Sequence, residues 1–350
     1  MKLLIDARPL VDPYSGGVRR VGIGLVEAIC HEASQDEITL LTTGREKREI
    51  PFTLPPNTKR IHLSWPNKLL SASLLMGCSL ERFLPERYDA YFFPNLGFTG
   101  PLKTPYSSLV HDLSFLIEPR WFSIKDRLWH RAVNPKRFMK QASAIFTVSD
   151  KTTNDLERYI GGIKQSYTIS MAHKRLAHTE SVEKAPAYFF AMSSEDKRKN
   201  LACLIEAMDV LTKEFPVQLY VTGSGTWNRP FVKALGRLSD QALANYVQGA
   251  KAVLYPSWYE GYGLPVHEAR NLGTPVIASI AGALPETVPP GTKLIQPEKP
   301  QLWLTAMKSM FLSDHTNEPI TQEHSWQEAA KIIVNKLREV SHPSNELEQH

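Results

Sequence analysis

The segment YPSWYEGYGLPVHEARNLGTPVIAS (255–279) combines two glutamates, a glycine-rich turn and two apolar runs. The preceding residues extend the first run to KAVLYP (251–256), which is typical of a buried strand that ends at a proline, because proline has no N–H to donate to a sheet. Pro265 suits the first turn of a helix, and Gly273 stands where that helix is expected to stop. TPVIAS supplies the next strand. The segment therefore predicts a βαβ unit of a parallel sheet.

The polar groups around the glycine turn indicate what it binds. Gly261 and Gly263 allow a ligand to approach the backbone closely, and the start of the helix directs free N–H groups and a partial positive charge at the mouth of the loop. Glu260 precedes the loop and Glu268 lies in the first helical turns, so we expect both to face one cleft. Free N–H groups bind phosphate and carboxylates bind hydroxyls, and a nucleotide sugar offers both.

The composition is that of a globular protein without an obvious macromolecular partner. The 350 residues, 42% hydrophobic and 22% charged, suffice for two cores of ordinary size. A net charge of +5 fits an anionic ligand or an acidic membrane surface and is too small to indicate nucleic-acid binding. The three cysteines show no metal or disulfide spacing, which favours a reducing cytoplasm. Asp6 and Arg8 interrupt the first apolar run, so we expect no signal peptide.

Apolar strands alternate with helical patterns in both halves of the chain. Strands are expected at 2–6, 38–43, 60–64, 89–93, 108–112 and 144–149, then at 187–192, 218–223, 252–256 and 275–279. Helices are expected at 18–33, 124–143 with a break near Pro135, 303–311 and 326–340. This alternation predicts an α/β protein with two doubly wound Rossmann-like domains facing across a cleft. The expected limits are 1–170 and 187–322 for the domains, 171–186 for a linker, 323–340 for a last helix and 341–350 for a frayed tail.

Two adjacent cations, Arg198 and Lys199, lie between an expected strand and a helix that is expected to begin near Asn200. A run of charges usually marks a solvated surface. Here, however, the positive end of a helix repels cations unless an anion lies between them. The pair is therefore interpreted as a clamp for a diphosphate.

Two features of the first half admit either a structural or a functional interpretation. His111 ends an expected strand, and a lone histidine is usually structural, although ligands of α/β sheets bind at the carboxyl ends of strands. Gly16 and Gly17 begin a glycine-rich stretch after the first strand, where they either shape a turn or present N–H groups to a phosphate or an acceptor. The sequence favours neither interpretation of the glycines.

The segment KDRLWHRAVNPKRFMK (125–140) is basic and contains several large apolar residues. It is either a peripheral contact with an acidic membrane or a surface helix of the first domain. Ser123 and Asp126 predict a capping box at its start. The chain contains no D-x-D, H-E-x-x-H or C-x-x-C motif, so we expect no tightly bound metal.

EGYGLPVHE (260–268) resembles the glutamate–seven–glutamate motif of the retaining family-4 (group 1) glycosyltransferases. Further segments are similar to that family in the same order, so the resemblance covers nearly the whole chain, from Met1 to about Leu337. These segments are VHDLSFL (110–116), AIFTVSD (144–150), EDKRKNLACLIEA (195–207), RLSDQALANYVQGAKAVLYPS (237–257) and HSWQEAA (324–330). The motif at 255–279 is highly specific and the other segments moderately so.

The resemblance implies a fold of the glycogen-phosphorylase-like (GT-B) type and a metal-independent, retaining hexosyl transfer. The donor would be a nucleotide-diphospho-sugar such as GDP-mannose, used without a cofactor. The acceptor would be a glycan or a lipid-linked molecule in the synthesis of a cell-surface polysaccharide such as lipopolysaccharide. We expect the protein in the cytoplasm, where 125–140 is either a peripheral contact with the inner face of the membrane or a surface helix of the first domain.

Individual roles follow from the same resemblance. Glu260 would contact the donor sugar, and Glu268 would hold the ribose of the nucleotide. The last helix would cross back onto the first, acceptor-side domain. The remaining roles are phosphate and hydroxyl contacts by the backbone of Gly261, Tyr262, Gly263 and Leu264, diphosphate binding by Arg198 and Lys199, donor binding by Ser193, and contact with the reacting centre by His111, Gly16 and Gly17.

Departures from the family pattern keep alternatives open. TWNRPFVKA (226–234) occupies a stretch where the family has a full helix near the base pocket, which leaves the base undetermined and a catalytically inactive homologue or partner subunit as an alternative. A dinucleotide oxidoreductase is a second alternative. The glycine spacing does not match that of such enzymes, and about 20 positions after the first loop the chain offers Asp36 to bind a ribose.

Overall fold

The computed structural model describes residues 1–12, 16–172, 187–192, 196–223, 225, 227–313 and 325–341. The chain divides into two compact units. Unit 1 comprises Met1–Ile117, Ser123–Ala172 and His324–His350, and unit 2 comprises Glu118–Phe122 and His173–Glu323. Most of the expected linker and all but one residue of the expected tail lie outside the described residues.

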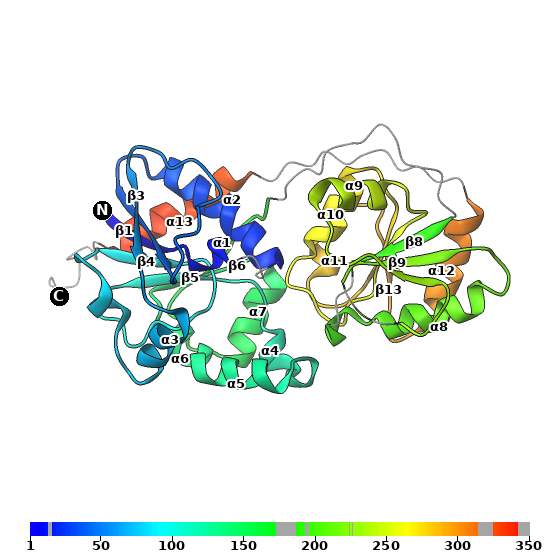
Figure 1. Cartoon of the computed structure of the whole chain (residues 1–350), viewed down its shortest axis with the longest axis horizontal. Helices are drawn as coiled ribbons and strands as arrows, with labels where there is room; N and C mark the ends of the chain where they lie inside the picture. The colour runs from blue at the N-terminus through cyan, green and yellow to red at the C-terminus, as the bar shows by residue number, and fades with distance from the viewer. Residues whose placement is uncertain are drawn as a thin grey trace, which may run out of the picture. The chain divides into compact units, whose positions relative to one another are not determined.

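Unit 1 is built on a seven-stranded parallel sheet with the order β3-β2-β1-β4-β5-β6-β7 (Figure 1). The chain runs outward from β1 in one direction and resumes at β4 on its other side, so the order reverses between β1 and β4. The strands are β1 (Lys2–Asp6), β2 (Glu37–Thr43), β3 (Thr58–Leu63), β4 (Ala90–Phe93), β5 (Tyr106–Val110), β6 (Ala144–Thr147) and β7 (Ser166–Thr168).

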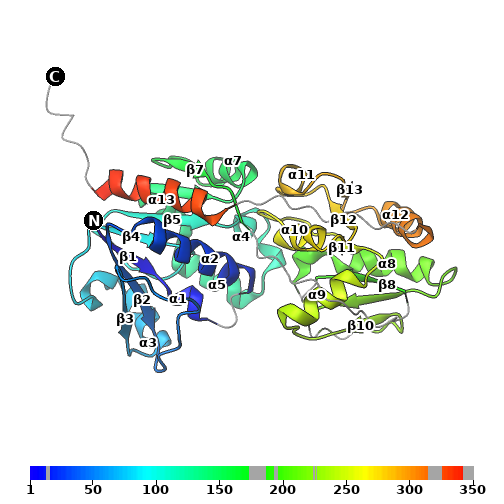
Figure 2. The same ribbon diagram turned by 90° about the horizontal axis from the view of Figure 1, so that it is seen from above.

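Helices cover both faces of this sheet (Figures 1 and 2). The long helices α2 and α13 pack side by side on one face, and α13 also contacts β4 and β5. On the other face, Phe138 of α6 packs edge-on against Phe93 and stacks on Tyr106. The helices of unit 1 are α1 (Arg8–Val11), α2 (Gly16–Glu32), α3 (Asn67–Leu75), α4 (Ser114–Ile117), α5 (Ile124–Val133), α6 (Pro135–Gln141), α7 (Asp150–Tyr159) and α13 (Trp326–Ser341), with the 3₁₀ turn η1 (Leu80–Phe83).

The break predicted near Pro135 is confirmed. Asn134 adopts a left-handed conformation with φ 52° and ends α5, and its side chain then accepts a hydrogen bond from the N–H of Arg137 at the start of α6. Proline at the first position of α6 costs no hydrogen bond there. At the start of α5, the predicted cap is also present, because Ser123 Oγ accepts a hydrogen bond from the N–H of Asp126 at 3.1 Å.

Unit 2 is built on a six-stranded parallel sheet with the order β10-β9-β8-β11-β12-β13. Its strands are β8 (Tyr188–Ala191), β9 (Gln218–Val221), β10 (Val232–Ala234), β11 (Val253–Tyr255), β12 (Val276–Ser279) and β13 (Lys293–Ile295). Its helices are α8 (Leu201–Leu211), α9 (Asp240–Gln248), α10 (Leu264–Asn271), α11 (Leu284–Thr287) and α12 (Pro300–Leu312), with the 3₁₀ turns η2 (Pro119–Trp121) and η3 (Lys197–Lys199).

A separate apolar cluster packs on each face of this second sheet. Residues of α8 and α12 form one cluster, in which Trp303 and Met307 are fully buried. Residues of α9 and α10 form the other, in which Val247 and Val266 are fully buried. Apolar strands buried on both faces are typical of parallel sheets. The prediction of two doubly wound Rossmann-like domains is therefore confirmed.

The stretch that departs from the family pattern contains no helix in its described residues. Between β9 and α9 the described residues form turns and the three-residue strand β10. The strands β7, β10 and β13 were not predicted from the sequence. None of the described helices combines the length and the apolar content needed to cross a bilayer.

Candidate functional site

The predicted clamp and the predicted glutamates follow neighbouring strands of unit 2. Arg198 and Lys199 lie in η3 after β8, and Glu260 lies in the loop after β11. β8 pairs with β11, and the strand order reverses between them, since β9 lies on the other side of β8. The carboxyl ends of strands at such a reversal are where open α/β sheets bind ligands.

Lys199 and Glu260 form a buried ion pair. Lys199 Nζ lies 2.6 Å from Glu260 Oε1 and donates a second hydrogen bond of 3.1 Å to the hydroxyl of Tyr255. The ammonium group also lies 4.9 Å from the centroid of the Tyr255 ring. Tyr255 is the last residue of β11, is 1% exposed and was not predicted as a site residue. Lys199 is thus held in one position by a carboxylate, a hydroxyl and an aromatic face.

The protonation of this cluster follows from its charges. Burial opposes the ionised form of Glu260, but Lys199 and then Arg198 outweigh burial, so the pKa of Glu260 lies below its ordinary value. Burial likewise opposes the charge of Lys199, yet Glu260 raises the pKa of Lys199 above its ordinary value. Burial, and next the charge of Glu260, raise the pKa of Tyr255. At neutral pH the cluster therefore contains an ammonium, a carboxylate and a neutral phenol.

This pairing changes one step of the sequence argument. The two cations were expected to need an external anion, but Glu260 of the same chain balances Lys199. Arg198 makes longer contacts, of 3.3 and 3.4 Å, to the carboxylate of Asp196. Both cations are consequently oriented by carboxylates of the protein itself.

Backbone contacts connect the two loops that carry the pair. The N–H of Trp258 donates to the carbonyl of Arg198 at 2.8 Å. Asn200 donates from Nδ2 to the carbonyls of Pro256, at 3.1 Å, and Pro297, at 2.7 Å. Asn200 is buried in a left-handed conformation with φ 52°, so its side chain joins the loops that follow β8, β11 and β13. Asn200 had been placed at the start of a helix, and this connecting role was not predicted.

The glycine loop after Glu260 leads into α10 as predicted. Gly263 has φ 93° and precedes the helix, Pro265 stands in its first turn, and Gly273 has φ 74° just beyond its end. No side chain caps the N-terminus of α10. Gly261 is buried in the loop, Leu264 is the first residue of α10, and the helix start points its backbone N–H groups away from the helix, as an anion site requires.

Glu268 and Tyr262 are also placed by α10. Glu268 is only 3% exposed, in the second turn of the helix. The ring of Tyr262 stacks on His267 with centroids 4.9 Å apart, and burial raises the pKa of Tyr262 to about 12. The hydroxyl of Thr287 donates to the carbonyl of Tyr262 at 2.5 Å. The loop from Glu260 to α10 is therefore fixed at several points.

The candidates in unit 1 occupy two different environments. His111 lies just after β5, and its Nε2 is 2.9 Å from the carbonyl oxygen of Pro94, to which a neutral ring donates from Nε2. Burial lowers the pKa of His111, against the opposing effects of that hydrogen bond and of Asp112. The contact leaves Nδ1 as the nitrogen able to meet a substrate and makes His111 a support for the loop after β4.

The glycines at the start of α2 do not share one role. A Cβ on Gly24 would overlap the indole of Trp326, and one on Gly22 would lie 3.2 Å from Leu10 Cδ1, so both are needed for helix packing. Gly16 and Gly17 have no atom within 4 Å of such a Cβ, and Gly16 has φ +48°. Packing therefore explains Gly22 and Gly24 but not Gly16 and Gly17.

Two further expectations concern Ser193 and the binding of a metal ion. Ser193 lies outside the described residues. In the described ranges of the chain, no three His, Cys, Asp or Glu side chains gather closely enough to hold a metal ion.

Comparison with known proteins identifies similar chains. Residues 186–312 match the family model described as glycosyl transferases group 1. The chain is 22% identical over 369 residues to the O-antigen chain mannosyltransferase B of Escherichia coli, covering 94% of this chain and 93% of that one.

Solved structures share the fold at lower identity. Sucrose-phosphate synthase from Thermosynechococcus elongatus matches with a TM-score of 0.65 at 17% identity, covering 98% of this chain and 96% of that one. Anabaena HepE in complex with UDP and glucose matches with a TM-score of 0.61 at 15% identity, covering 98% and 99%. The fold expected from the sequence, two Rossmann-like sheets of the GT-B type, is that of these proteins.

Proposed function

The chain belongs to the group 1 glycosyltransferases, and from this premise we propose that it transfers a hexose from a nucleotide-diphospho-sugar to a glycan or lipid-linked acceptor with retained configuration. The observation that carries the proposal is the buried Lys199–Glu260 pair at the reversal point of the unit 2 sheet. The pair supports the proposal because it fixes a cation and a carboxylate in the loops that follow β8 and β11, and the second of these loops leads into the uncapped N-terminus of α10.

The proposed chemistry is departure of a nucleoside diphosphate from the anomeric carbon. Negative charge grows on the leaving oxygen, and Lys199, Arg198 and the start of α10 are fixed positive groups that would stabilise it without reorganising. The backbone of Gly261–Leu264 would contact the phosphate and sugar hydroxyls, Glu260 the sugar and Glu268 the ribose. His111, Gly16 and Gly17 would serve the acceptor side. The reaction would need no metal and no cofactor.

Two candidate donors, which differ in sugar and base, are suggested by similar proteins. The E. coli relative is named a mannosyltransferase of O-antigen chains, which favours mannose and a cell-surface polysaccharide. GDP-mannose is therefore our first candidate donor. The Anabaena structure contains UDP and glucose, so UDP-glucose is the second.

A thermal-shift and hydrolysis panel tests the donor. A nucleotide that binds only the folded protein stabilises it by about 2.7 kcal/mol at a hundredfold excess over Kd. GDP should raise the melting temperature without added metal, and GDP-mannose should be hydrolysed slowly. A melting curve that GDP, UDP and ADP all leave unmoved at millimolar concentration would contradict the proposal. Binding without turnover of any donor or acceptor would favour the inactive homologue.

The clamp itself is tested by variants of one 3₁₀ turn. Lys199→Ala should lower turnover roughly 100-fold or more, as loss of one preorganised donor does. Lys197→Ala is the matched control, because Lys197 lies exposed in the same turn and should leave turnover close to wild type. Equal activities of the two variants would remove Lys199 from the reaction.

The two glutamates should separate in a titration. Glu268→Gln should weaken nucleoside diphosphate and intact donor alike, by a factor of about 10 to 150 for one charge-assisted hydrogen bond. Glu260→Gln should spare the diphosphate more than the donor, although loss of its charge also releases Lys199. Equal loss of diphosphate affinity in both variants, measured by calorimetry, would refute this division of roles.

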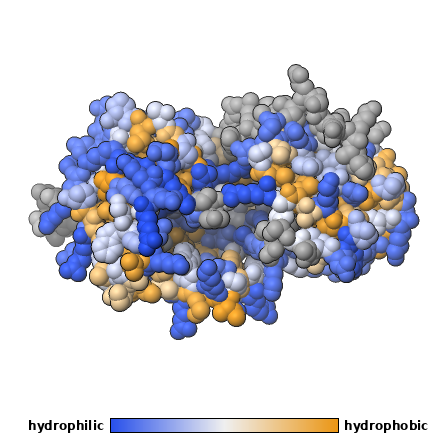
Figure 3. Space-filling model, viewed as in Figure 1, coloured by the Kyte–Doolittle hydropathy of each residue, from blue (hydrophilic) through white to orange (hydrophobic). Residues whose placement is uncertain are grey.

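We also propose that 125–140 makes a peripheral contact with an acidic membrane. α5 has no buried residue, and Ile124 and Leu128, one turn apart, are 69% and 63% exposed. Hydrophobic surface lies over α5 at the lower edge of unit 1 in Figure 3, beside hydrophilic atoms. Exposed apolar side chains on a basic helix are typical of helices that lie in a membrane interface.

The dinucleotide oxidoreductase alternative loses its ribose ligand, because Asp36 is paired with Arg338 at 2.7 Å.

Vesicle sedimentation tests this contact. The protein should sediment with vesicles of phosphatidylcholine and phosphatidylglycerol and much less with phosphatidylcholine alone. Leu128→Asp should abolish sedimentation. Leu302→Asp, at a leucine that is 47% exposed on α12 of unit 2, should not. Equal sedimentation of both variants would contradict a role for α5.

A further inference from the structure

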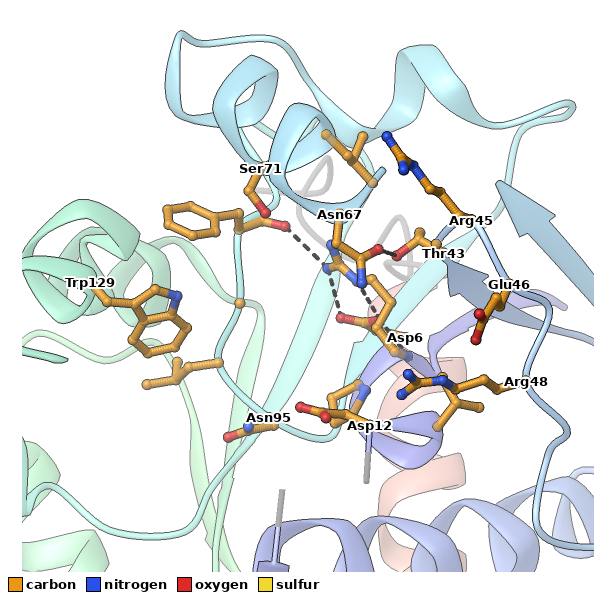
Figure 4. A pocket seen from close by; sticks show the side chains of 18 residues that line it. Asp6, Asp12, Thr43, Arg45, Glu46, Arg48, Asn67, Ser71, Asn95 and Trp129 are labelled. Carbon is orange, nitrogen blue, oxygen red and sulfur yellow. Dashed lines mark hydrogen bonds and ion pairs between the residues drawn. The ribbon is translucent and has the colours of Figure 1, made fainter. Parts of the chain in front are cut away.

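Unit 1 contains a cavity of about 660 Å³ that takes no part in the nucleotide-binding roles above. Its walls come from residues that follow β1, β2 and β4, together with side chains of α3 and α5 (Figure 4). It therefore opens at the carboxyl ends of the strands, at the point where the order of the unit 1 sheet reverses between β1 and β4. Ligands of doubly wound sheets bind at this position, and the volume is that of an ordinary ligand pocket.

Two charged residues of the cavity lining, Arg8 and Asp6, already form an ion pair with each other. Arg8 Nε and Nη2 donate to the two carboxylate oxygens of Asp6, at 2.7 and 2.8 Å, and Nη2 also donates to the carbonyl of Phe98 at 3.1 Å. Asp6 is 2% exposed. This pair connects the end of β1 to the loop after β4 and shapes the cavity rather than adding charge to it.

Other polar side chains that line the cavity have hydrogen-bonding capacity to spare. The carbonyl of Asn67 accepts from Thr43 Oγ1 at 2.8 Å, which fixes the amide and leaves its NH₂ group without a partner among the described residues. The side chains of Asn95 and Arg48 likewise have no hydrogen-bond partner in the described part of the chain. Asn95 directly follows Pro94, whose carbonyl His111 holds at 2.9 Å.

An aromatic side chain forms the opposite wall. Figure 4 shows Trp129 on one side of the cavity and Glu46 and Arg48 on the other, with Asp12 and Asn95 between them. The Trp129 ring lies edge-on to Phe98 with centroids 6.0 Å apart and is 39% exposed. The indole therefore keeps accessible surface beside a polar floor.

The charges of the lining decide between ligand classes. Asp6, Asp12 and Glu46 match Arg8, Arg45 and Arg48 in number, so the formal charge of the lining is zero. A phosphate would face the carboxylates of Asp12 and Glu46. A sugar can donate hydroxyls to carboxylates and accept from guanidinium and amide groups, while its C–H face covers an aromatic ring.

We propose that this cavity binds an uncharged sugar residue of the acceptor, with Asn95 and Asn67 donating to its hydroxyls and Trp129 covering its apolar face. The assignment of the sugar to an acceptor rests on the proposed function; the binding of a saccharide by the cavity does not. His111 then acts as a positioning residue, because it holds the carbonyl next to Asn95.

Fluorine NMR of protein labelled with 5-fluorotryptophan tests saccharide binding without any donor. The chain contains seven tryptophans, and Trp129→Phe identifies the resonance of Trp129. Methyl α-mannoside, methyl α-glucoside and the corresponding disaccharides should shift this resonance in a saturable way at millimolar to tens of millimolar concentration. Asn95→Ala should weaken the effect at least tenfold. Trp65, 45% exposed and outside the cavity, provides a resonance that should not move.

Two results would overturn the proposal. One is that no saccharide moves the Trp129 resonance, or that all move Trp129 and Trp65 alike. The other is that inorganic phosphate moves it in a saturable way and saccharides do not, which would assign the cavity to an anion. If the protein proves active, Asn95→Ala should raise the acceptor KM at least tenfold. If wild type hydrolyses no donor, the proposed function is refuted, whereas the NMR evidence for saccharide binding still holds.

Discussion

Glu260 is held in place by a glycine outside the segment that predicted it. Gly282 follows β12 with φ +62°, and a Cβ at this position would overlap the backbone of Glu260. The next N–H, that of Ala283, donates to the Glu260 carbonyl at 2.9 Å. The sequence identified Glu260 because it lies in a recognisable loop. It did not identify Gly282, because only the folded chain brings the two backbones together.

Gly282→Ala should therefore reduce both stability and activity. A left-handed alanine costs about 1–2 kcal/mol, and the overlap with Glu260 adds about 1–3 kcal/mol. Displacement of Glu260 should also lower donor hydrolysis at least tenfold. Gly236→Ala is the matched control, since Gly236 has φ +67° but no atom within 4 Å of a Cβ. Denaturant titration and hydrolysis assays that find the two variants alike would contradict the argument.

The Lys199–Glu260 pair also predicts how stability depends on pH. Because the pKa of Glu260 is below its ordinary value in the folded protein, the ionised carboxylate stabilises the fold above the ordinary glutamate pKa. This contribution is lost as the pH falls through the folded pKa. The free energy of unfolding of wild type should therefore fall more steeply between about pH 6 and pH 3 than that of Glu260→Gln. Parallel curves would show that the pair adds nothing to stability.

At the scale of elements, the strands that the sequence missed share one property. β7, β10 and β13 each contain three residues and form an edge of a sheet. Ser166–Thr168 and Val232–Ala234 contain no fully buried residue, so they lack the apolar run by which the central strands were predicted. Tyr255 shows the reverse problem. It was predicted correctly as a strand residue, but a buried strand residue gives no sign in the sequence that its hydroxyl accepts a hydrogen bond from Lys199.

The pair of helices α2 and α13 offers a test of what the glycine-rich stretch does. Gly24→Ala should lower the free energy of unfolding by about 1–3 kcal/mol, because the new methyl group overlaps the indole of Trp326. Gly17→Ala, in the same helix with open space around it, should raise stability by up to about 1 kcal/mol. Urea titrations of both variants measure whether each change raises or lowers the free energy of unfolding. Destabilisation of equal size would show that helix packing does not distinguish these glycines.

At the scale of the whole molecule, each unit has an apolar core of its own. Ile5, Phe92 and Ile145 are fully buried in unit 1, and α13, although it follows unit 2 in the sequence, adds the fully buried Ile333 to that core. The core of unit 2 includes the fully buried Met307 of α12. All the residues proposed to bind the nucleotide belong to unit 2. A unit with its own core can unfold on its own.

Calorimetry should therefore resolve two unfolding transitions. A nucleoside diphosphate should raise the melting temperature of only one of them. Ile333→Ala removes fully buried methyl groups from unit 1. It should lower the melting temperature of the transition that does not respond to the nucleotide, by the equivalent of about 2–5 kcal/mol in the free energy of unfolding. Met307→Ala should lower the transition that the nucleotide does raise, by a similar amount. The diphosphate affinity of Ile333→Ala, titrated well below its melting temperature, should equal that of wild type. A single transition that both variants lower equally would show that the two cores unfold together.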